Sequence, residues 1–237
     1  MKNSKVNELE IFLQGELVDL CIPTADFALH SNWYKWFNDK SNNKYLEQGA
    51  IPNTKSKQLN FFENISDDRV VLIIVNKEKI PIGVISLSFI NLDKKCCDIA
   101  LVVSNDGDKK MKPFNSLEAM ALMTTHAFET IGMLRVNAGQ HINLAGWQCR
   151  MEILGYQLEG LHKKKFVKGN EVADSMSISA SKENYELISK KRGGALWDGY
   201  KEMHRRIKAM PKKRYVDMLV QFYNNERDKY YKKIFTL

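Results

Sequence analysis

The stretch LEAMALMTTHAFETIGMLRVNAGQHINLAGWQCRMEILGYQLEG, residues 117–160, opens with the clearest helical pattern in the chain. Its apolar stripe recurs at helical spacing and consists of Leu117, Met120, Ala121, Thr124, Ala127, Phe128 and Ile131. This spacing predicts a long helix over residues 115–131 that buries one face. Asn115 and Glu118 fit a capping pair at its start.

The same stretch changes pattern twice after this helix. Residues 134–142 indicate a strand, and residues 145–154 indicate a short helix that a glycine ends. A last pair of strands follows, joined by a turn around residues 168–170. Helix, strand, helix and hairpin therefore follow one another without a long connection.

Three β-branched runs precede the long helix, at residues 69–76, 81–90 and 97–104. The turns between them are short and rich in Lys, Asp and Asn, which is typical of an antiparallel meander. Further upstream, residues 16–23 predict a first strand, and two short helices follow it. The predicted order is one strand, two helices, three strands, a helix, a strand, a helix and two strands.

Length and composition indicate one folded domain with an appendage. The chain has 237 residues, of which 44% are hydrophobic and 27% charged, as in ordinary globular proteins. It offers no apolar run of the ~20 residues that a membrane span needs and no secretory signal pattern, so we expect a cytoplasmic protein. Its four cysteines lack metal-ligand spacing, so we expect reduced thiols and no metal.

Charge is distributed unevenly along the chain. Residues 190–237 contain 14 Lys/Arg against 5 Asp/Glu, whereas residues 1–189 contain 22 against 23. We therefore expect a near-neutral domain over residues 1–189 and a basic, helical C-terminal extension over residues 190–237. The extension carries aromatic and methionine residues at helical spacing, which predicts packing on the domain or on a second copy, and so allows a homodimer. The alternative is that the extension binds an anionic partner such as nucleic acid, which we do not expect, or an acidic membrane surface.

The order of elements resembles the GNAT superfamily of N-acetyltransferases, and within it the RimJ/RimL-like branch. Residues 117–160 are similar to that branch in the Glu-Ala that opens the helix, the Phe-Glu near its end and the Leu-Gly-aromatic before a Glu-Gly. Residues 31–49 resemble its tryptophan-containing first helix and Asn-Asp turn. The resemblance covers roughly residues 14–188 and implies an α/β (α+β) fold, in which helices flank a mixed, mostly antiparallel sheet.

The resemblance also implies acetyl-CoA as co-substrate. In the family, the strands before and after the long helix splay apart, and the pantetheine arm lies between them. The pyrophosphate lies at the N-terminus of the long helix, where free N–H groups and the helix dipole favour an anion. The positions implied here are Ile99, Leu101, Val103, Met111, Lys112, Phe114, Asn115, Ser116, Leu117 and Asn143.

The pyrophosphate loop departs from the family pattern. The family's Arg/Gln-x-x-Gly-x-Gly/Ala positions correspond to Met111, Phe114 and Ser116, so both glycines and their conformational freedom are lost. Pro113 also removes an N–H donor. Three lysines in the same loop could supply charge instead: Lys109, Lys110 and Lys112. The loop is therefore either a CoA site with lysine charge or a degenerate one.

Amide formation requires a neutral amine and a route for its proton. The resemblance implies Asp98 as a catalytic candidate, because family members carry an acidic residue on this strand. His141 is the second candidate, since histidine titrates near neutral pH. A solvent-facing aspartate and a hydrogen-bonded structural histidine are the alternatives. The resemblance implies an acceptor pocket lined by Trp33, Tyr45, Glu47 and Gln48.

The resemblance implies an enzyme that transfers an acetyl or other short acyl group from CoA to a primary amine. The resemblance suggests a nucleotide-linked amino sugar in surface-polysaccharide synthesis as acceptor, with a protein amine as the alternative. A competing interpretation is a non-catalytic GNAT-like module that binds an anionic partner through its basic tail. Loss of the loop glycines is the feature that favours this competing interpretation.

Overall fold

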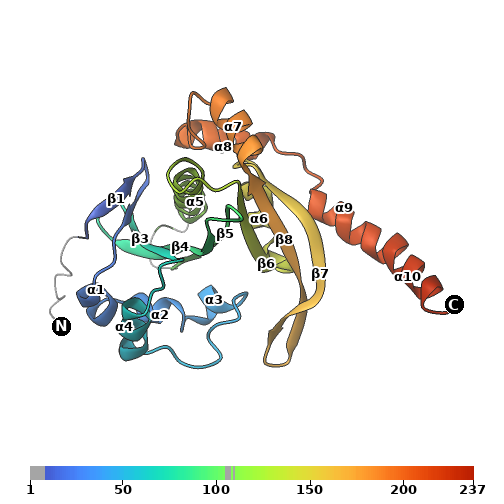
Figure 1. Ribbon diagram of the computed structural model, residues 1–237, viewed down its shortest axis with the longest axis horizontal. Coiled ribbons are helices and arrows are strands. Elements are labelled where there is room, and N and C mark those ends of the chain that lie inside the picture. Colours follow the sequence, from blue (N-terminus) through green and yellow to red (C-terminus); the bar gives the residue numbers. More distant parts are fainter. Residues whose placement is uncertain (1–8, 105–107, 109) are drawn as a thin grey trace.

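The structure is a computed structural model that describes residues 9–104, 108 and 110–237. An eight-stranded sheet runs through it in the order β1-β2-β3-β4-β5-β6-β8-β7 (Figure 1). β5 and β6 pair in parallel, and the other neighbours pair antiparallel. The strands are β1 (Ile11–Gln14), β2 (Val18–Cys21), β3 (Val70–Asn76), β4 (Pro81–Asn91), β5 (Cys96–Val103), β6 (Arg135–His141), β7 (Tyr156–Lys168) and β8 (Glu171–Ser181).

Helices cover both faces of the sheet. The first four lie on one side of β3 and β4, and α5 lies on the other (Figure 1). The helices are α1 (Ala25–His30), α2 (Trp33–Trp36), α3 (Lys40–Asn43), α4 (Lys55–Glu63), α5 (Lys112–Glu129), α6 (Ala145–Glu152), α7 (Lys182–Lys191), α8 (Tyr200–Ala209), α9 (Tyr215–Phe222) and α10 (Asp228–Ile234). The predicted mixed α/β fold, mostly antiparallel and flanked by helices, is confirmed.

Alternation along β3 shows why the sheet needs two covers. Leu72 and Ile74 belong to the apolar core under α5, whereas Val71, Ile73 and Val75 belong to the core under α1, α2 and α4. Successive side chains of a strand point to opposite faces, so a continuous β-branched run is buried on both. The meander is thereby fixed between two helical layers.

The N-terminal region differs from the predicted single strand. Two strands, β1 and β2, form there and are joined by a turn at residues 15–17. α1 follows immediately, capped by Thr24, whose hydroxyl accepts a hydrogen bond from the Phe27 N–H at 3.1 Å. A helix of six residues is too short to give a clear periodic pattern.

The start of the long helix also differs from the prediction. α5 begins at Lys112, because Pro113 suits the first turn of a helix, and its N-cap residue Met111 makes no side-chain capping bond. The predicted capping pair of Asn115 and Glu118 is therefore wrong. The Glu118 carboxylate instead accepts hydrogen bonds from three backbone N–H groups of the β1–β2 turn, at residues 16–18, over 2.5, 2.6 and 2.9 Å.

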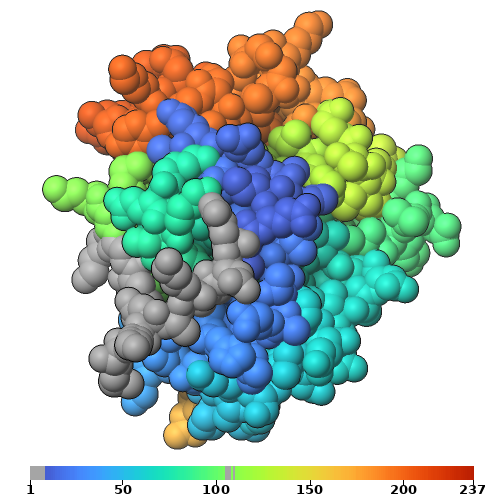
Figure 2. Space-filling model, turned by 90° about the vertical axis from the view of Figure 1, so that its left-hand side faces the viewer, coloured from blue at the N-terminus to red at the C-terminus, as the bar shows by residue number. Residues whose placement is uncertain are grey.

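The C-terminal extension folds back on the domain before it projects outward. Leu196, Met203 and Val216 are buried in the same core as α5. Figure 2 shows the orange extension lying directly on the blue N-terminal strands, and Figure 1 shows α9 and α10 pointing away from the sheet. The first part of the extension is therefore a packing element, as its apolar stripe predicted.

Candidate functional site

A gap opens in the middle of the sheet between β5 and β6. Among the described residues these strands pair only over Cys96–Asp98 and Arg135–Asn137. Beyond that point β5 continues along β4 as far as Val103, and β6 continues along β8 as far as His141. Two backbone edges therefore face one another, and such edges can bind an extended ligand through main-chain hydrogen bonds.

Asp98 and Asn137 stand where the two strands begin to diverge. The Asn137 side-chain amide donates a hydrogen bond to Asp98 Oδ1 at 3.1 Å. Arg135 Nε in turn donates to Asn137 Oδ1 at 2.5 Å, which fixes the orientation of the amide. Asp98 lies directly opposite Ser88 of β4 in the sheet register. The carboxylate is thus held at the narrow end of the gap.

A cavity of about 780 Å³ adjoins this position on the face covered by α1–α4. Its apolar lining includes Trp33, Phe37, Phe61, Val84, Leu101 and Val102. Its polar lining includes Glu47, Gln48, Lys57, Arg69, Ser86 and Ser88. Three of the four residues implied for the acceptor pocket therefore line this cavity, and Ser88 connects it to Asp98 across the strand pair.

Tyr45, the fourth, contacts His141 instead. The two rings lie 4.7 Å apart, centroid to centroid, and the Phe166 ring meets the histidine ring edge-on at a centroid distance of 4.5 Å. His141 is buried, and its Nδ1 accepts the Asn143 backbone N–H at 3.0 Å. The neutral imidazole therefore carries its proton on Nε2, which lies 3.4 Å from a Glu171 carboxylate oxygen.

The surroundings of His141 differ from those of Asp98. The lone pair that a general base needs is already used by the Asn143 N–H. His141 is also four residues beyond Asn137 along β6, a separation of roughly 13 Å in a strand. The structure therefore does not bring the two catalytic candidates together, and it packs His141 against Tyr45.

The β7–β8 hairpin holds the segment that follows α3. Lys168 Nζ donates hydrogen bonds to the Asn43 backbone oxygen at 2.6 Å and to its side-chain oxygen at 3.1 Å. The Asn43 side-chain amide donates to the Phe37 carbonyl at 2.8 Å. Glu47 and Gln48 are therefore carried on a segment that is anchored from the far side of the gap.

The first turn of α5 does not offer the free N–H groups expected there. The Met111 and Lys112 N–H groups donate to the Asp108 carbonyl at 3.1 and 3.0 Å. Pro113 has no N–H, and the Phe114 and Asn115 N–H groups donate to the Met111 carbonyl at 3.0 and 2.9 Å. Among residues 111–115, which the structure describes, every backbone donor is used, so an anion would have to bind through side chains or displace Asp108.

Other residues implied for this loop are also engaged. The Ser116 hydroxyl donates to the Lys112 carbonyl at 2.8 Å, and Leu117 is fully buried in the core. The Phe114 ring contacts Tyr200 of α8 edge-on at a centroid distance of 4.8 Å. Lys109, the first of the loop lysines, lies outside the described residues. Sequence patterns do not reveal the contact between Phe114 and Tyr200, because the two residues are far apart along the chain.

Burial keeps the Cys97 thiol and the Tyr156 phenol in their protonated forms at neutral pH. Burial raises the pKa of Cys97 to about 12, so its nucleophilic thiolate is scarce at neutral pH. Burial also raises the pKa of Tyr156, whose hydroxyl is 2.7 Å from that of Thr124. Within the described residues no cluster of three or more His, Cys, Asp or Glu side chains could hold a metal ion.

None of the helices in the described part of the chain combines the length and the apolar character that crossing a membrane requires.

No family model matches the chain, and no curated protein matches it in sequence. Similarity is found instead among solved structures.

Three of these structures illustrate the likeness. A GCN5-related N-acetyltransferase from Brucella melitensis is 16% identical with a TM-score of 0.65, over 86% of this chain and 96% of its own. A GNAT-family acetyltransferase from Bacillus anthracis is 19% identical with a TM-score of 0.61, over 73% and 99%. Spermidine N-acetyltransferase from Vibrio cholerae, solved with CoA and spermine, is 11% identical with a TM-score of 0.64, over 73% and 99%. At such identities the likeness shows the fold alone, and this chain has the GNAT fold.

Proposed function

We propose that this chain is an acyl-CoA-dependent N-acyltransferase that transfers an acetyl or other short acyl group to a primary amine. One observation carries the proposal: β5 and β6 diverge at Asp98 and Asn137, and Ser88, opposite Asp98 in β4, lines a cavity of about 780 Å³. The gap suits an extended pantetheine arm, and the cavity suits the acceptor. The GNAT fold, shared with an enzyme solved with CoA and spermine, supports this assignment.

Each part of the site has a distinct task in this reaction. The backbone edge from Ile99 to Val103 would hold the arm of acyl-CoA, which supplies the thioester carbonyl that a neutral amine attacks. Asp98 would take up the proton that the amine loses as the C–N bond forms, because its carboxylate keeps lone pairs beyond the one that accepts from Asn137. The thioester C–S bond would then break, and the leaving CoA thiolate would take up that proton and depart as the free thiol. His141 would hold Tyr45 and, through it, the segment that carries Glu47.

For the acceptor we propose a nucleotide-linked amino sugar, with a protein amine as the alternative. The cavity combines the cations Lys57 and Arg69 with the hydroxyls of Ser86 and Ser88. Cations favour phosphate oxygens, and hydroxyl groups can bond sugar hydroxyls. Glu47 contributes negative charge for the amine. Lys57 and Arg69 would repel a polyamine, so the lining fits a mixed anionic and hydroxylated acceptor better.

A second candidate function is a GNAT-fold module that does not use CoA. The used N–H groups at residues 111–115 favour it, because an anion gains least from a helix terminus whose donors are already bonded. Such a module would bind an anionic partner through its basic tail, and that binding would weaken steeply as salt rises.

Calorimetry and thermal shift with acetyl-CoA, CoA and nucleotide sugars separate these candidates. Selective ligand binding to the folded protein raises its apparent stability by mass action. We expect acetyl-CoA to bind and to raise the melting temperature, and we expect thiol release when a suitable amine is added. Absence of acetyl-CoA binding at millimolar concentration would overturn the acyltransferase proposal.

A further inference from the structure

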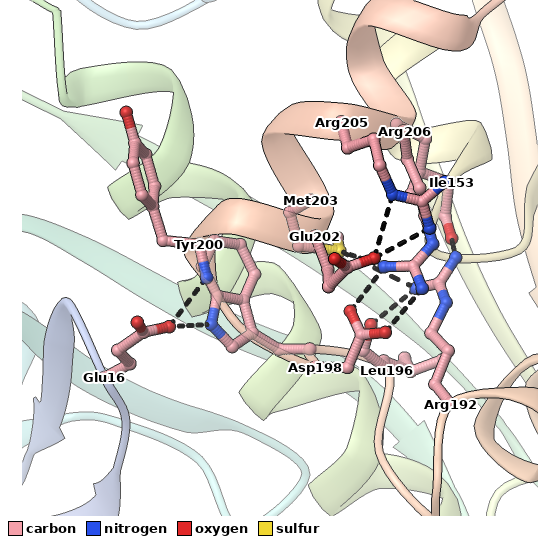
Figure 3. Close-up of polar contacts among 11 residues, drawn as sticks. Glu16, Ile153, Arg192, Leu196, Asp198, Tyr200, Glu202, Met203, Arg205 and Arg206 are labelled. Atoms are coloured by element: carbon pink, nitrogen blue, oxygen red, sulfur yellow. Dashed lines mark hydrogen bonds and ion pairs between the residues drawn. The ribbon is translucent and has the colours of Figure 1, made fainter.

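Helix α8 of the C-terminal extension is bonded to the β1–β2 turn. Glu16 Oε2 accepts hydrogen bonds from the Trp197 indole N–H at 2.9 Å and from the Tyr200 backbone N–H at 2.8 Å (Figure 3). Both bonds end on one carboxylate oxygen. A single acidic residue in the turn therefore fixes where α8 begins.

The same turn is bonded to α5, so that the contacts form a closed ring. Glu118 of α5 accepts the backbone N–H groups of residues 16–18. Glu16 then holds the start of α8, and Tyr200 of α8 contacts the Phe114 ring in the first turn of α5. His204, one helical turn further, lies 5.6 Å from the same ring. The chain of contacts thus leaves α5 at Glu118, in its second turn, and returns to it at Phe114, in its first turn.

Further bonds hold α8 and the segment that leads into it. The Arg192 guanidinium donates to the Leu196 carbonyl at 2.5 Å and to the Ile153 carbonyl, beyond the end of α6, at 2.6 Å. Arg206 pairs with Asp198 through two bonds (Figure 3). Because the pairs are half-buried and the helix buries its apolar face, α8 is an integral part of the fold and not a movable cover.

We propose that α8 is a positioning element of the acyl-donor site: through Phe114, it sets the first turn of α5 against which the phosphate end of acyl-CoA binds. This inference rests on the proposed function. Phe114 stands where a glycine is expected, and its ring contacts two rings of the extension. The lost glycine and the added tail are therefore two parts of one arrangement.

The used backbone donors make this positioning matter. The N–H groups of residues 111–115 are bonded internally. Acyl-CoA can therefore bind this turn only through the turn's side chains and its surface shape. Movement of Phe114 shifts Met111 and Lys112 as well, because all three belong to one bonded turn. Removing the Tyr200 ring should therefore weaken donor binding and leave acceptor binding unchanged.

Paired variants test the inference in the full-length protein. Tyr200→Ala removes the ring contact with Phe114, whereas Tyr200→Phe keeps it. Glu16→Ala removes both hydrogen bonds to the Trp197 indole and the Tyr200 N–H, whereas Glu16→Gln keeps a side-chain oxygen that can accept them. Tyr230→Ala, on the exposed part of α10, is the matched control. The measurements are the acetyl-CoA dissociation constant, the acceptor KM and hydrogen exchange of the Phe114 to Ser116 amides.

We expect Tyr200→Ala and Glu16→Ala to weaken acetyl-CoA binding about 3- to 10-fold, in line with the loss of one aromatic contact or two hydrogen bonds. Both should speed exchange at residues 114–116, and Tyr200→Phe, Glu16→Gln and Tyr230→Ala should match the wild type. Wild-type affinity in both alanine variants would overturn the inference and leave the proposed function standing. If the wild type binds no acetyl-CoA, the proposed function and the donor-site inference both fail. Unchanged hydrogen exchange at residues 114–116 in both alanine variants would show that α8 does not position the turn.

Discussion

The side-chain amide of Asn137 donates to the Asp98 carboxylate at 3.1 Å, across the last residue pair that joins β5 to β6. This bond fixes the carboxylate where the strands separate and leaves its other lone pairs available. Ser88, opposite Asp98 in β4, lines the adjoining cavity. Asp98 is therefore placed between the donor gap and the acceptor cavity.

Replacing Asp98 by Asn should remove proton uptake and keep the shape of the site. We expect kcat to fall ~10²- to 10⁴-fold, the usual contribution of a general base, with acetyl-CoA affinity nearly unchanged. Steady-state kinetics and calorimetry measure the two effects. Asp93→Asn, on the exposed β4–β5 turn, should match the wild type. Unchanged turnover in Asp98→Asn would make Asp98 a structural residue.

His141 should support the acceptor loop and not transfer protons. His141→Ala removes the ring between Tyr45 and Phe166, so we expect faster hydrogen exchange at residues 44–50 and an acceptor KM several-fold higher, with kcat preserved. His141→Phe keeps an aromatic ring and should restore most of both. His162→Ala, at an exposed position of β7, is the control.

The opposite result would restore His141 as a base. A fall of kcat by ~10²-fold or more in His141→Phe, the scale expected for proton transfer, together with loss of a limb in the pH–rate profile, would contradict the support role. Such a result would mean that the Asn143 N–H releases Nδ1 during the reaction.

The long helix and most of the strands could be predicted from sequence, because their signals are local. α5 is an 18-residue helix with a regular stripe, and β3 is a continuous β-branched run. The split into β1 and β2 could not be predicted, because Glu118, a hundred residues away, bonds the turn between them. Thr24 was an available capping signal for α1.

For the candidate site too, local features could be predicted from sequence and contacts with other elements could not. Glu47 and Gln48 lie on a polar loop in the expected region, and they do line the cavity. The backbone N–H groups at the start of α5 are bonded within a local turn to the Asp108 carbonyl, which the sequence pattern does not reveal. The ring contact on His141 comes from Tyr45, which is far away along the chain. A resemblance can place a residue on an element, but hydrogen-bond partners from elsewhere decide what remains free to react.

Glu118 should contribute strongly to stability. Glu118→Ala would leave the three backbone N–H groups of residues 16–18 without their acceptor. We expect a loss of about 3 kcal/mol in the free energy of unfolding, because an unsatisfied buried donor costs roughly 1 to 3 kcal/mol. Urea unfolding measures it. Glu186→Ala, at an exposed position of α7, should change stability by less than about 0.5 kcal/mol; equal stability of the two variants would contradict the prediction.

Cys97 should resist alkylation in the folded protein. Its pKa, raised by burial to about 12, leaves roughly one thiol in 10⁴ ionised at pH 8. Neighbouring Cys96 is more exposed and serves as the internal control. We expect iodoacetamide at pH 8 to label Cys96 first, and both thiols to be labelled in urea, as mass spectrometry with fragmentation can resolve. Faster labelling of Cys97 would show that the strand opens readily.

Graded truncation should separate the two parts of the C-terminal extension. A chain that ends at Gly193 loses Leu196, Met203 and Val216, which are at most 1% exposed. Burying three such side chains stabilises a protein by roughly 5 kcal/mol, comparable with the whole stability of many domains. We therefore expect this chain to be unstable or insoluble.

A chain that ends at Asn224 loses only the projecting part, where Tyr230 is 61% and Phe235 80% exposed. These side chains contribute little to the domain core, and changes at exposed positions alter the free energy of unfolding by under about 0.5 kcal/mol each. The melting temperature should therefore stay within a few degrees of the wild-type value. Light scattering on both proteins tests whether this segment forms a homodimer: a dimer that becomes a monomer at unchanged melting temperature would assign the exposed apolar face to self-association. A large fall in melting temperature without a change in mass would contradict the division and make α10 part of the domain's own packing.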